Sequence, residues 1–145
     1  MKKRVLITGG AGFIAHHTIK HILNYTDWEI VSLDRLDYSG NLNRISDMMS
    51  EISKKDKRRL RVVHHDLRAE VNDMLAADLG KFNFILHMAA SSHVDRSITD
   101  PLTFVYDNVV ATCNILNFAR KTKNLELFVY FSTDEVFGPA PNKVK

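Results

Sequence analysis

The sequence has a single cysteine, Cys113, among its 145 residues. One thiol excludes a disulfide within the chain and favours a reducing compartment, so we expect a cytoplasmic protein. Cys113 itself lies in an apolar helical pattern, which favours packing in the core over chemistry. No apolar run approaches the roughly 20 residues that cross a membrane. The short run at 5–7 reaches Gly9 too soon for a signal peptide, so we expect no membrane association.

The chain also lacks repeats, low-complexity tracts and linkers rich in proline, glycine or serine, which indicates one domain over residues 1–145. Its net charge of +3 is small, and much of the basic excess lies in one run at 54–59. No aromatic residue stands beside this run, so we interpret it as a solvated surface segment and expect no nucleic-acid partner. The five histidines on the first helix and after the third strand have no acidic partner at metal spacing, so we expect no metal.

What the sequence does contain is a regular alternation of two patterns. Apolar runs typical of buried strands occur at 5–7, 28–33, 60–64, 82–88 and 125–131. Helical patterns occur at 15–23, 42–52, 68–79 and from Asp100 onward, where Asp100 can cap and Pro101 suits the first helical position. The buried stripe of this last helix is predicted to hold Val105, Val109, Thr112, Cys113 and Leu116.

Strands that are apolar throughout and alternate with helices predict an α/β fold with a parallel sheet covered on both sides. Right-handed crossovers then give a doubly wound sheet of five strands in the order 3-2-1-4-5. A sheet of six or seven strands would need more chain, so we expect this fold to be truncated.

The first strand and helix are joined by a glycine-rich turn. Gly9 would permit the tight turn, and Gly12 would let backbone N–H groups approach a pyrophosphate at the positive end of the helix. Asp34 ends the second strand, where a carboxylate can accept both ribose hydroxyls and would repel a 2′-phosphate. These positions predict a dinucleotide site that prefers NAD to NADP, although Arg35 could instead pair with a 2′-phosphate.

The segment at 8–15, TGGAGFIA, resembles the glycine-rich motif of the extended short-chain dehydrogenase/reductase family, with Ala15 in place of the final glycine. Three further segments are similar to the dTDP-glucose 4,6-dehydratase subgroup. They are DRLDYSGN at 34–41, HMAASSHVDRS at 87–97 and STDEVFG at 132–138. The resemblance runs from the first strand to the end of the chain, so it implies the NAD-binding Rossmann domain of such an enzyme.

The resemblance implies a role for each matching position. Phe13 and Ile14 would line the pyrophosphate, the segment Asp34, Arg35, Leu36 and Asp37 would hold the adenosine ribose, and Asp66 and Leu67 would lie at the adenine. Met88, Ala89, Ala90 and Ser91 would pass under the nicotinamide half, while Ser92 and Thr133 would face the sugar. Asp107 stands where the family often has threonine, and Phe137 stands where it often has tyrosine.

Asp134 and Glu135 follow the fifth strand, at the sheet edge where ligands bind in such folds. Elimination of water needs an acid and a base, and two carboxylates in different environments can supply both. The resemblance assigns Glu135 to the C5 proton, Asp134 to the leaving C6 hydroxyl and Thr133 to the sugar near C4. The reaction implied is oxidation at C4, elimination of water across C5 and C6, and return of hydride to C6, which gives a 4-keto-6-deoxy sugar.

The family's oxidation step uses a tyrosine and a lysine four residues later, and none of the four tyrosines here has such a lysine. We therefore expect the chain alone to turn over no sugar nucleotide. A UDP-glucose dehydratase, a nucleotide-sugar 4-epimerase and a non-catalytic NAD-binding module remain alternatives, although epimerases generally lack the Asp134–Glu135 pair. We expect the parent enzyme to be a homodimer that pairs through the helix from Asp100, and the bare edge of the fifth strand to self-associate.

Overall fold

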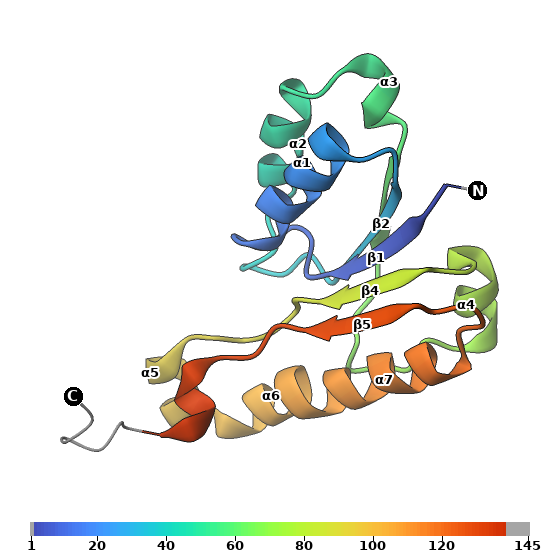
Figure 1. The fold of residues 1–145 in the computed structure, drawn as a ribbon. Coiled ribbons are helices and arrows are strands. Elements are labelled where there is room, and N and C mark those ends of the chain that lie inside the picture. The colour runs from blue at the N-terminus through green and yellow to red at the C-terminus, as the bar shows by residue number, and fades with distance from the viewer. Residues whose placement is uncertain (1, 139–145) are drawn as a thin grey trace, which may run out of the picture.

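The computed structural model describes residues 2–138 and contains a five-stranded parallel sheet (Figure 1). The strand order is β3-β2-β1-β4-β5, as the sequence predicted. The strands span Arg4–Thr8 (β1), Glu29–Asp34 (β2), Leu60–His64 (β3), Phe84–His87 (β4) and Leu127–Tyr130 (β5). Strands β2 and β3 lie on one side of β1, and β4 and β5 lie on the other. In such folds ligands bind in the crevice where the strand order reverses, which here lies at the carboxyl ends of β1, β2 and β4.

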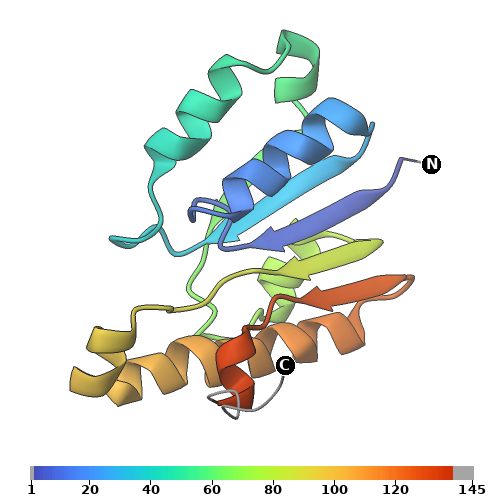
Figure 2. The same cartoon turned by 60° about the vertical axis from the view of Figure 1, so that its left-hand side comes forward.

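Helices cover both faces of the sheet (Figures 1 and 2). One face carries α1 (Ala15–Tyr25), α2 (Leu42–Ser50) and the short α3 (Lys54–Lys57). The other carries α4 (Asp73–Leu79) and a long helix made of α6 (Pro101–Val105), the π-helical turn η1 (Tyr106–Val110) and α7 (Ala111–Lys121). Two short helices lie at the carboxyl edge, α5 (Val94–Thr99) and the 3₁₀ turn η2 (Asp134–Phe137).

The alternation of side chains along the strands divides the core into two clusters. Leu6 and Ile85 pack toward α4 and α7, whereas Val5, Ile7 and Ile30 pack toward α1 and α2. Strands that are apolar on both faces are what a sheet buried between helices requires. The central strand β1 is the best buried and fixes the position of the turn that follows it.

The helix after β3 departs most from its predicted bounds. The helix predicted at 68–79 begins only at Asp73, because Asn72 caps it by accepting a hydrogen bond from the N–H of Leu75 at 2.9 Å. The freed residues form a loop in which the N–H of Arg68 donates to Asp66 Oδ1 at 2.9 Å. Helices α3 and α5 were not predicted, since four and six residues show too little of a period.

The predicted face of the long helix was wrong. Of the five predicted residues, Val105, Val109, Cys113 and Leu116 are exposed, and the cysteine does not pack in the core. Thr112 alone is half-buried, where its hydroxyl contacts His87 at 2.9 Å. The buried residues are instead Asp107, Ala111, Ile115, Phe118 and Ala119. Both stripes recur at helical spacing and lie on different sides of the same helix, so the apolar period alone could not decide between them.

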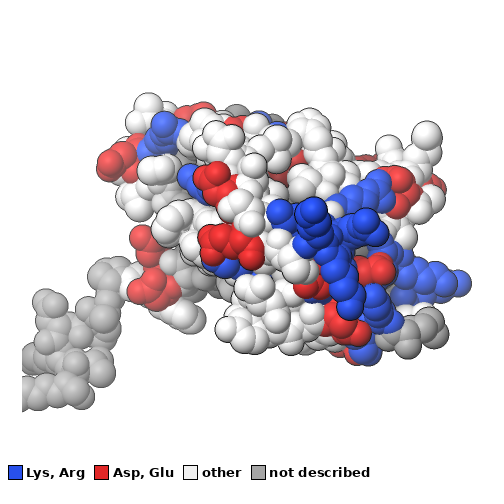
Figure 3. Space-filling view, turned by 90° about the horizontal axis from the view of Figure 1, so that it is seen from above, with Lys and Arg blue, Asp and Glu red and all other residues white. Residues whose placement is uncertain are grey.

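The basic run at 54–59 includes α3, and its side chains are exposed or half-buried, as expected of a solvated segment. Lysine and arginine gather on one side of the view in Figure 3, which looks onto the face carrying α1, α2 and α3. Arg59, in contrast, makes defined contacts with the rest of the protein. It donates to the carbonyl of Trp28 at 2.8 Å and pairs with Asp56 at 2.9 Å. Among the described helices, none has both the length and the apolar character that a bilayer crossing needs.

Candidate functional site

A pocket opens at the carboxyl ends of β1, β2, β3 and β4. It brings together many of the residues that the sequence singled out, namely Gly9, Asp34, Arg35, Asp37, Asp66, Leu67, Ala89, Ala90 and Ser91. Its other lining residues are Leu33, Ser39, His65, Asp107 and Ala111. Segments far apart in the sequence therefore meet in one place, as the switch point of the sheet predicts.

Gly9 begins the turn from β1 into α1 and has a φ of +70°, in the left-handed region that glycine adopts most easily. A Cβ there would lie 2.8 Å from the Cα of Ala89, so the turn packs directly on the loop after β4. The N–H of Gly9 donates to the carbonyl of Leu33 at 2.9 Å, which ties the turn to β2 as well. Glycine at this position thus lets three strand ends converge on the pocket.

The N-terminus of α1 has no side-chain cap and no acidic residue in its first turn. Helices α2, α3, α4 and α6 are in contrast capped by Asn41, Ser53, Asn72 and Asp100. An uncapped helix start leaves backbone N–H groups and a positive dipole end for an anion, which suits the pyrophosphate of a dinucleotide. Phe13 and Ile14, which precede this helix, are largely exposed and do not line the pocket.

Asp34 is a buried carboxylate at the end of β2. Its Oδ2 accepts a hydrogen bond from the N–H of Ala11 at 2.9 Å, and its Oδ1 accepts one from the N–H of Leu36 at 2.8 Å. Leu36 has a φ of +54°, a strained backbone for a residue with a side chain, and strain of this kind gathers at functional sites. A carboxylate can accept about four hydrogen bonds, so Asp34 is held in place with acceptor capacity left for ribose hydroxyls.

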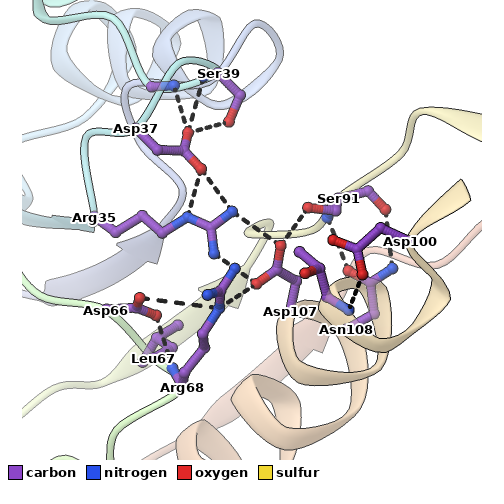
Figure 4. A network of polar contacts seen from close by, with 12 residues as sticks. Arg35, Asp37, Ser39, Asp66, Leu67, Arg68, Ser91, Asp100, Asp107 and Asn108 are labelled. Carbon is purple, nitrogen blue, oxygen red and sulfur yellow. Dashed lines mark hydrogen bonds and ion pairs between the residues drawn. The ribbon is translucent and has the colours of Figure 1, made fainter. Parts of the chain in front are cut away.

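Asp107 is the centre of a larger polar network (Figure 4). It lies in the π-helical turn η1 and is only 6% exposed. Its Oδ1 accepts hydrogen bonds from Arg35 at 2.5 Å and Arg68 at 2.7 Å, and its Oδ2 accepts from Arg35 at 2.9 Å and the Ser91 hydroxyl at 2.6 Å. Burial alone would raise the pKa of Asp107, but the hydrogen bonds from Arg35, Arg68 and Ser91 outweigh it and hold that pKa well below the usual range.

The network joins three loops to the long helix. Arg35 comes from the loop after β2, Arg68 from the loop after β3 and Ser91 from the loop after β4. Asn108, the neighbour of Asp107, accepts from the N–H of Ser91 at 2.8 Å and donates to its carbonyl at 2.9 Å. Of the two neighbours in this π-helical turn, Asp107 lines the pocket and Asn108 holds the backbone of Ser91. Turns of this kind occur frequently at functional sites.

A second network lies beneath the loop after β4. The buried His87 contacts the hydroxyls of Thr8 at 2.7 Å and Thr112 at 2.9 Å. Thr8 Oγ1 also accepts from the N–H groups of Met88 and Ala89, both at 3.1 Å. Burial lowers the pKa of His87 to about 4, so the ring is neutral near pH 7. The predicted residues Met88 and Ala89 are therefore positioned by Thr8.

Thr133, Asp134 and Glu135 do not line the pocket and are exposed at the start of η2. Thr133 caps this turn by accepting a hydrogen bond from the N–H of Glu135 at 3.3 Å, and its hydroxyl donates to Asp134 Oδ1 at 3.3 Å. Ser92 is also exposed, one residue beyond the pocket lining. These four side chains lie at the carboxyl edge of the sheet, and their catalytic and substrate roles stay predictions.

Sequence reasoning missed the central position of Asp107 and the part that Arg68 plays. Asp107 stood out only as an unusual residue for its position, and nothing about Arg68 distinguished it from other surface arginines. The signal that was available is the charge of Asp107 itself, since an aspartate within an apolar helix is seldom buried unless it is paired.

Comparisons with known proteins agree with this geometry. The family model described as GDP-mannose 4,6 dehydratase matches residues 6–144. A dTDP-glucose 4,6-dehydratase from Salmonella typhimurium is 37% identical over 147 residues, which cover 96% of this chain and 39% of that protein. The chain thus spans about two fifths of the length of this curated relative.

Solved structures give the same picture. The dTDP-glucose 4,6-dehydratase from Streptomyces venezuelae, solved with NAD bound, is 36% identical with a TM-score of 0.82, and the match covers 96% of this chain and 42% of that one. The UDP-Glc/GlcNAc 4-epimerase from Campylobacter jejuni is 32% identical with a TM-score of 0.79, covering 94% and 39%. The fold is therefore shared with both a dehydratase and an epimerase.

Proposed function

Since the chain belongs to the GDP-mannose 4,6 dehydratase family, we propose that it is the NAD-binding part of a nucleotide-sugar 4,6-dehydratase that acts on dTDP-glucose. The observation that carries this proposal is Asp34, a buried carboxylate held by two backbone N–H groups beside the Gly9 turn. This arrangement supports binding of the adenosine ribose through Asp34 and of the pyrophosphate at the uncapped start of α1. The relatives named dTDP-glucose 4,6-dehydratase support the reaction and the sugar nucleotide.

The remaining positions of the pocket fit this proposal. Asp66 and Leu67 lie on the β3 side, where the adenine would sit, and Ala89 to Ser91 lie on the β4 side, toward the nicotinamide half. NAD would supply a hydride acceptor that returns the hydride within the same cycle. The chain's own contribution is to hold the cofactor's two halves across β1, with Gly9 and Asp34 fixing the adenosine half.

The residues after β5 are assigned to the chemistry of the sugar. In the proposal Glu135 removes the C5 proton, Asp134 protonates the departing C6 hydroxyl and Thr133 donates a hydrogen bond near C4. Their exposure at the start of η2 places them beyond the pocket, free to contact a substrate that enters from solvent. The Asp134–Glu135 pair favours a dehydratase over a 4-epimerase, because elimination of water needs an acid and a base together.

The first test is calorimetric titration of the protein with NAD. We expect binding by the wild type and a loss of at least tenfold in affinity for Asp34→Ala, since the ribose hydroxyls lose their acceptor. Asp78→Ala is the matched control, because Asp78 pairs with Arg61 on the surface and does not line the pocket. A wild type that does not bind NAD, or an Asp34→Ala variant that binds as tightly, would contradict the proposal.

The catalytic assignment needs a protein that also carries the tyrosine–lysine pair. In such an enzyme, Asp134→Asn should leave NAD affinity unchanged and slow the loss of the C6 hydroxyl by roughly 100-fold or more, the usual scale of general acid catalysis. Rapid-quench detection of the 4-keto-6-deoxy product measures that step. Turnover at the wild-type rate would remove Asp134 from the mechanism.

A homodimer forms part of the proposal. Leu102, Val105, Tyr106, Val109 and Leu116 are all exposed apolar residues of the α6–η1–α7 helix. An apolar stripe on the outer side of a helix is typical of a surface that another protein covers.

The free thiol of Cys113, exposed on the same helix, supports a reducing compartment such as the cytoplasm.

A further inference from the structure

The hydrogen-bonding capacity of Asp107 is fully used within the protein. Its two oxygens accept four hydrogen bonds, two of them from Arg35 and one each from Arg68 and Ser91. A carboxylate has room for about four, so none is left for a cofactor hydroxyl. Asp107 therefore acts on the pocket through the side chains it holds, and the most directly held is Arg35.

Arg35 is held from two sides at once (Figure 4). Asp107 takes its terminal nitrogens Nη1 and Nη2 in a bidentate pair, while Asp37 accepts from Nε at 2.6 Å. Nη2 also lies 2.6 Å from Asp37 Oδ2. The hydrogen bond to Asp107 raises the pKa of Arg35 further above its already high value. All three guanidinium nitrogens of Arg35 thus contact carboxylates of the same chain, Nη1 and Nη2 at Asp107 and Nε and Nη2 at Asp37.

The position of Arg35 gives this ion pair its significance. Arg35 directly follows Asp34, the carboxylate beside which the adenosine ribose is proposed to bind, and both residues line the same pocket. An arginine at this point of a dinucleotide fold is the usual partner of a 2′-phosphate. Four carboxylates line the pocket, those of Asp34, Asp37, Asp66 and Asp107. Only two guanidinium groups pair with them, those of Arg35 and Arg68. The local charge is therefore negative, which repels a phosphate.

We propose that Asp107 is a specificity-determining residue that withholds Arg35 from a 2′-phosphate, so that the pocket takes NAD and rejects NADP. This inference rests on the proposed function, because it assumes that a dinucleotide binds beside Asp34. Asp107 acts from the long helix, and it is a positioning residue that does not touch the cofactor. Binding NADP through Arg35 would require breaking a bidentate ion pair in a poorly solvated place, which is costly.

The test compares NAD and NADP affinities by calorimetric titration of the whole protein. Asp107→Asn keeps the shape of the side chain and removes its charge, so it should raise NADP affinity relative to NAD by about tenfold, the scale of one charge-assisted hydrogen bond. The double variant Asp107→Asn with Arg35→Leu should lose that gain, because the arginine that captures the phosphate is gone. Asp78→Asn is the matched control, since it also neutralises a carboxylate that pairs with an arginine, Arg61, but it lies outside the pocket and should leave the ratio of the two affinities unchanged.

A second variant guards against misfolding of Asp107→Asn. Asp37→Asn frees the Nε edge of Arg35 from a half-buried position and should shift the ratio in the same direction. An unchanged ratio in both folded variants, with NAD still bound, would overturn this inference alone. A gain that Arg68→Leu cancels and Arg35→Leu does not would also overturn it. A wild type that binds no NAD would overturn the proposed function and this inference together.

Discussion

At the scale of the residue, Gly9 sets the closest approach in the pocket. A methyl group there would meet the backbone of Ala89, with its Cα at 2.8 Å and its nitrogen at 3.0 Å. Gly80 has a similar φ, +78° against +70°, but a methyl group there would meet only the flexible end of Arg4. The two positions share one kind of backbone strain and differ in what surrounds them, so they form a natural pair for mutation.

Gly9→Ala should lower the free energy of unfolding by roughly 2–4 kcal/mol, from left-handed strain plus overpacking. Gly80→Ala should cost only about 1–2 kcal/mol, because Arg4 can move. Urea denaturation followed by circular dichroism measures both. NAD titration adds a second reading, since only Gly9→Ala should impair binding. Equal losses of stability at the two sites would show that the contact with Ala89 carries no energy.

His87 gives the protein a defined dependence on acid. Its folded pKa, about 4, lies below the ordinary histidine value of 6.5, so the unfolded chain takes up the proton first as the pH falls. The contribution of the neutral His87 ring to the free energy of unfolding is therefore complete above about pH 6.5 and is lost as the pH falls from about 6.5 to 4. The loss should reach roughly 3 kcal/mol at the acid end of this window.

The comparison variant is His87→Gln, whose amide can still bridge the hydroxyls of Thr8 and Thr112 but does not titrate. The free energy of unfolding, measured at several pH values between 7.5 and 4.5, should fall more steeply for the wild type than for the variant. Parallel curves would mean that the native protein binds the proton as readily as the unfolded chain, and the assignment of a neutral ring would be wrong.

Asp34 and Asp107 mark how far sequence reasoning reaches at this scale. Asp34 could be predicted because it ends an apolar strand at a fixed distance after a glycine-rich turn, so local pattern and fold point to the same function. Asp107 depends on Arg35 and Arg68, which come from loops 72 and 39 positions away. Contacts between distant loops leave no local pattern, so the network became visible only in three dimensions.

At the scale of the element, the long helix shows the same limit. Strand order could be predicted because five apolar runs alternate with helices, and right-handed crossovers leave few arrangements. The helix from Asp100 is apolar on two sides, and its period fits either side against the sheet. Ile115 is fully buried, whereas its neighbour Leu116 is 47% exposed, contrary to the predicted stripe. The side of the helix that is buried is the one that packs against β4 and β5, where Ile115 joins the cluster of Ile85 and Phe128.

Alanine substitutions at the neighbours Ile115 and Leu116 therefore test which side of the long helix is buried. Ile115→Ala should cost about 2–4 kcal/mol in the free energy of unfolding, since it empties a fully packed site. Leu116→Ala should cost less than about 1 kcal/mol when measured at a protein concentration low enough to keep the chain monomeric. Thermal or urea denaturation of the two variants decides between the faces. The reverse order of the two losses would restore the stripe predicted from sequence.

At the scale of the whole molecule, two apolar surfaces point in different directions. The first is the outer side of the α6–η1–α7 helix, where Val109 is 61% exposed. The second is β5, an edge strand of the described sheet, where Leu127 is 54% exposed and Tyr130 and Phe131 are also exposed. A helix stripe paired with its own copy gives a closed dimer, whereas a strand edge offers backbone hydrogen bonds and supports open-ended association. A net charge of +3 does little to oppose either.

The two modes of association can be separated with one charged substitution on each surface. Val109→Asp should remove a discrete dimer and leave larger species that grow with concentration. Leu127→Lys should do the reverse, because a lysine on an edge strand discourages further pairing. Light scattering coupled to size-exclusion chromatography distinguishes the outcomes across a concentration series. A wild type that stays a monomer at high concentration would contradict both expectations, and a dimer that survives Val109→Asp but not Leu127→Lys would place the dimer on the sheet edge instead of the helix.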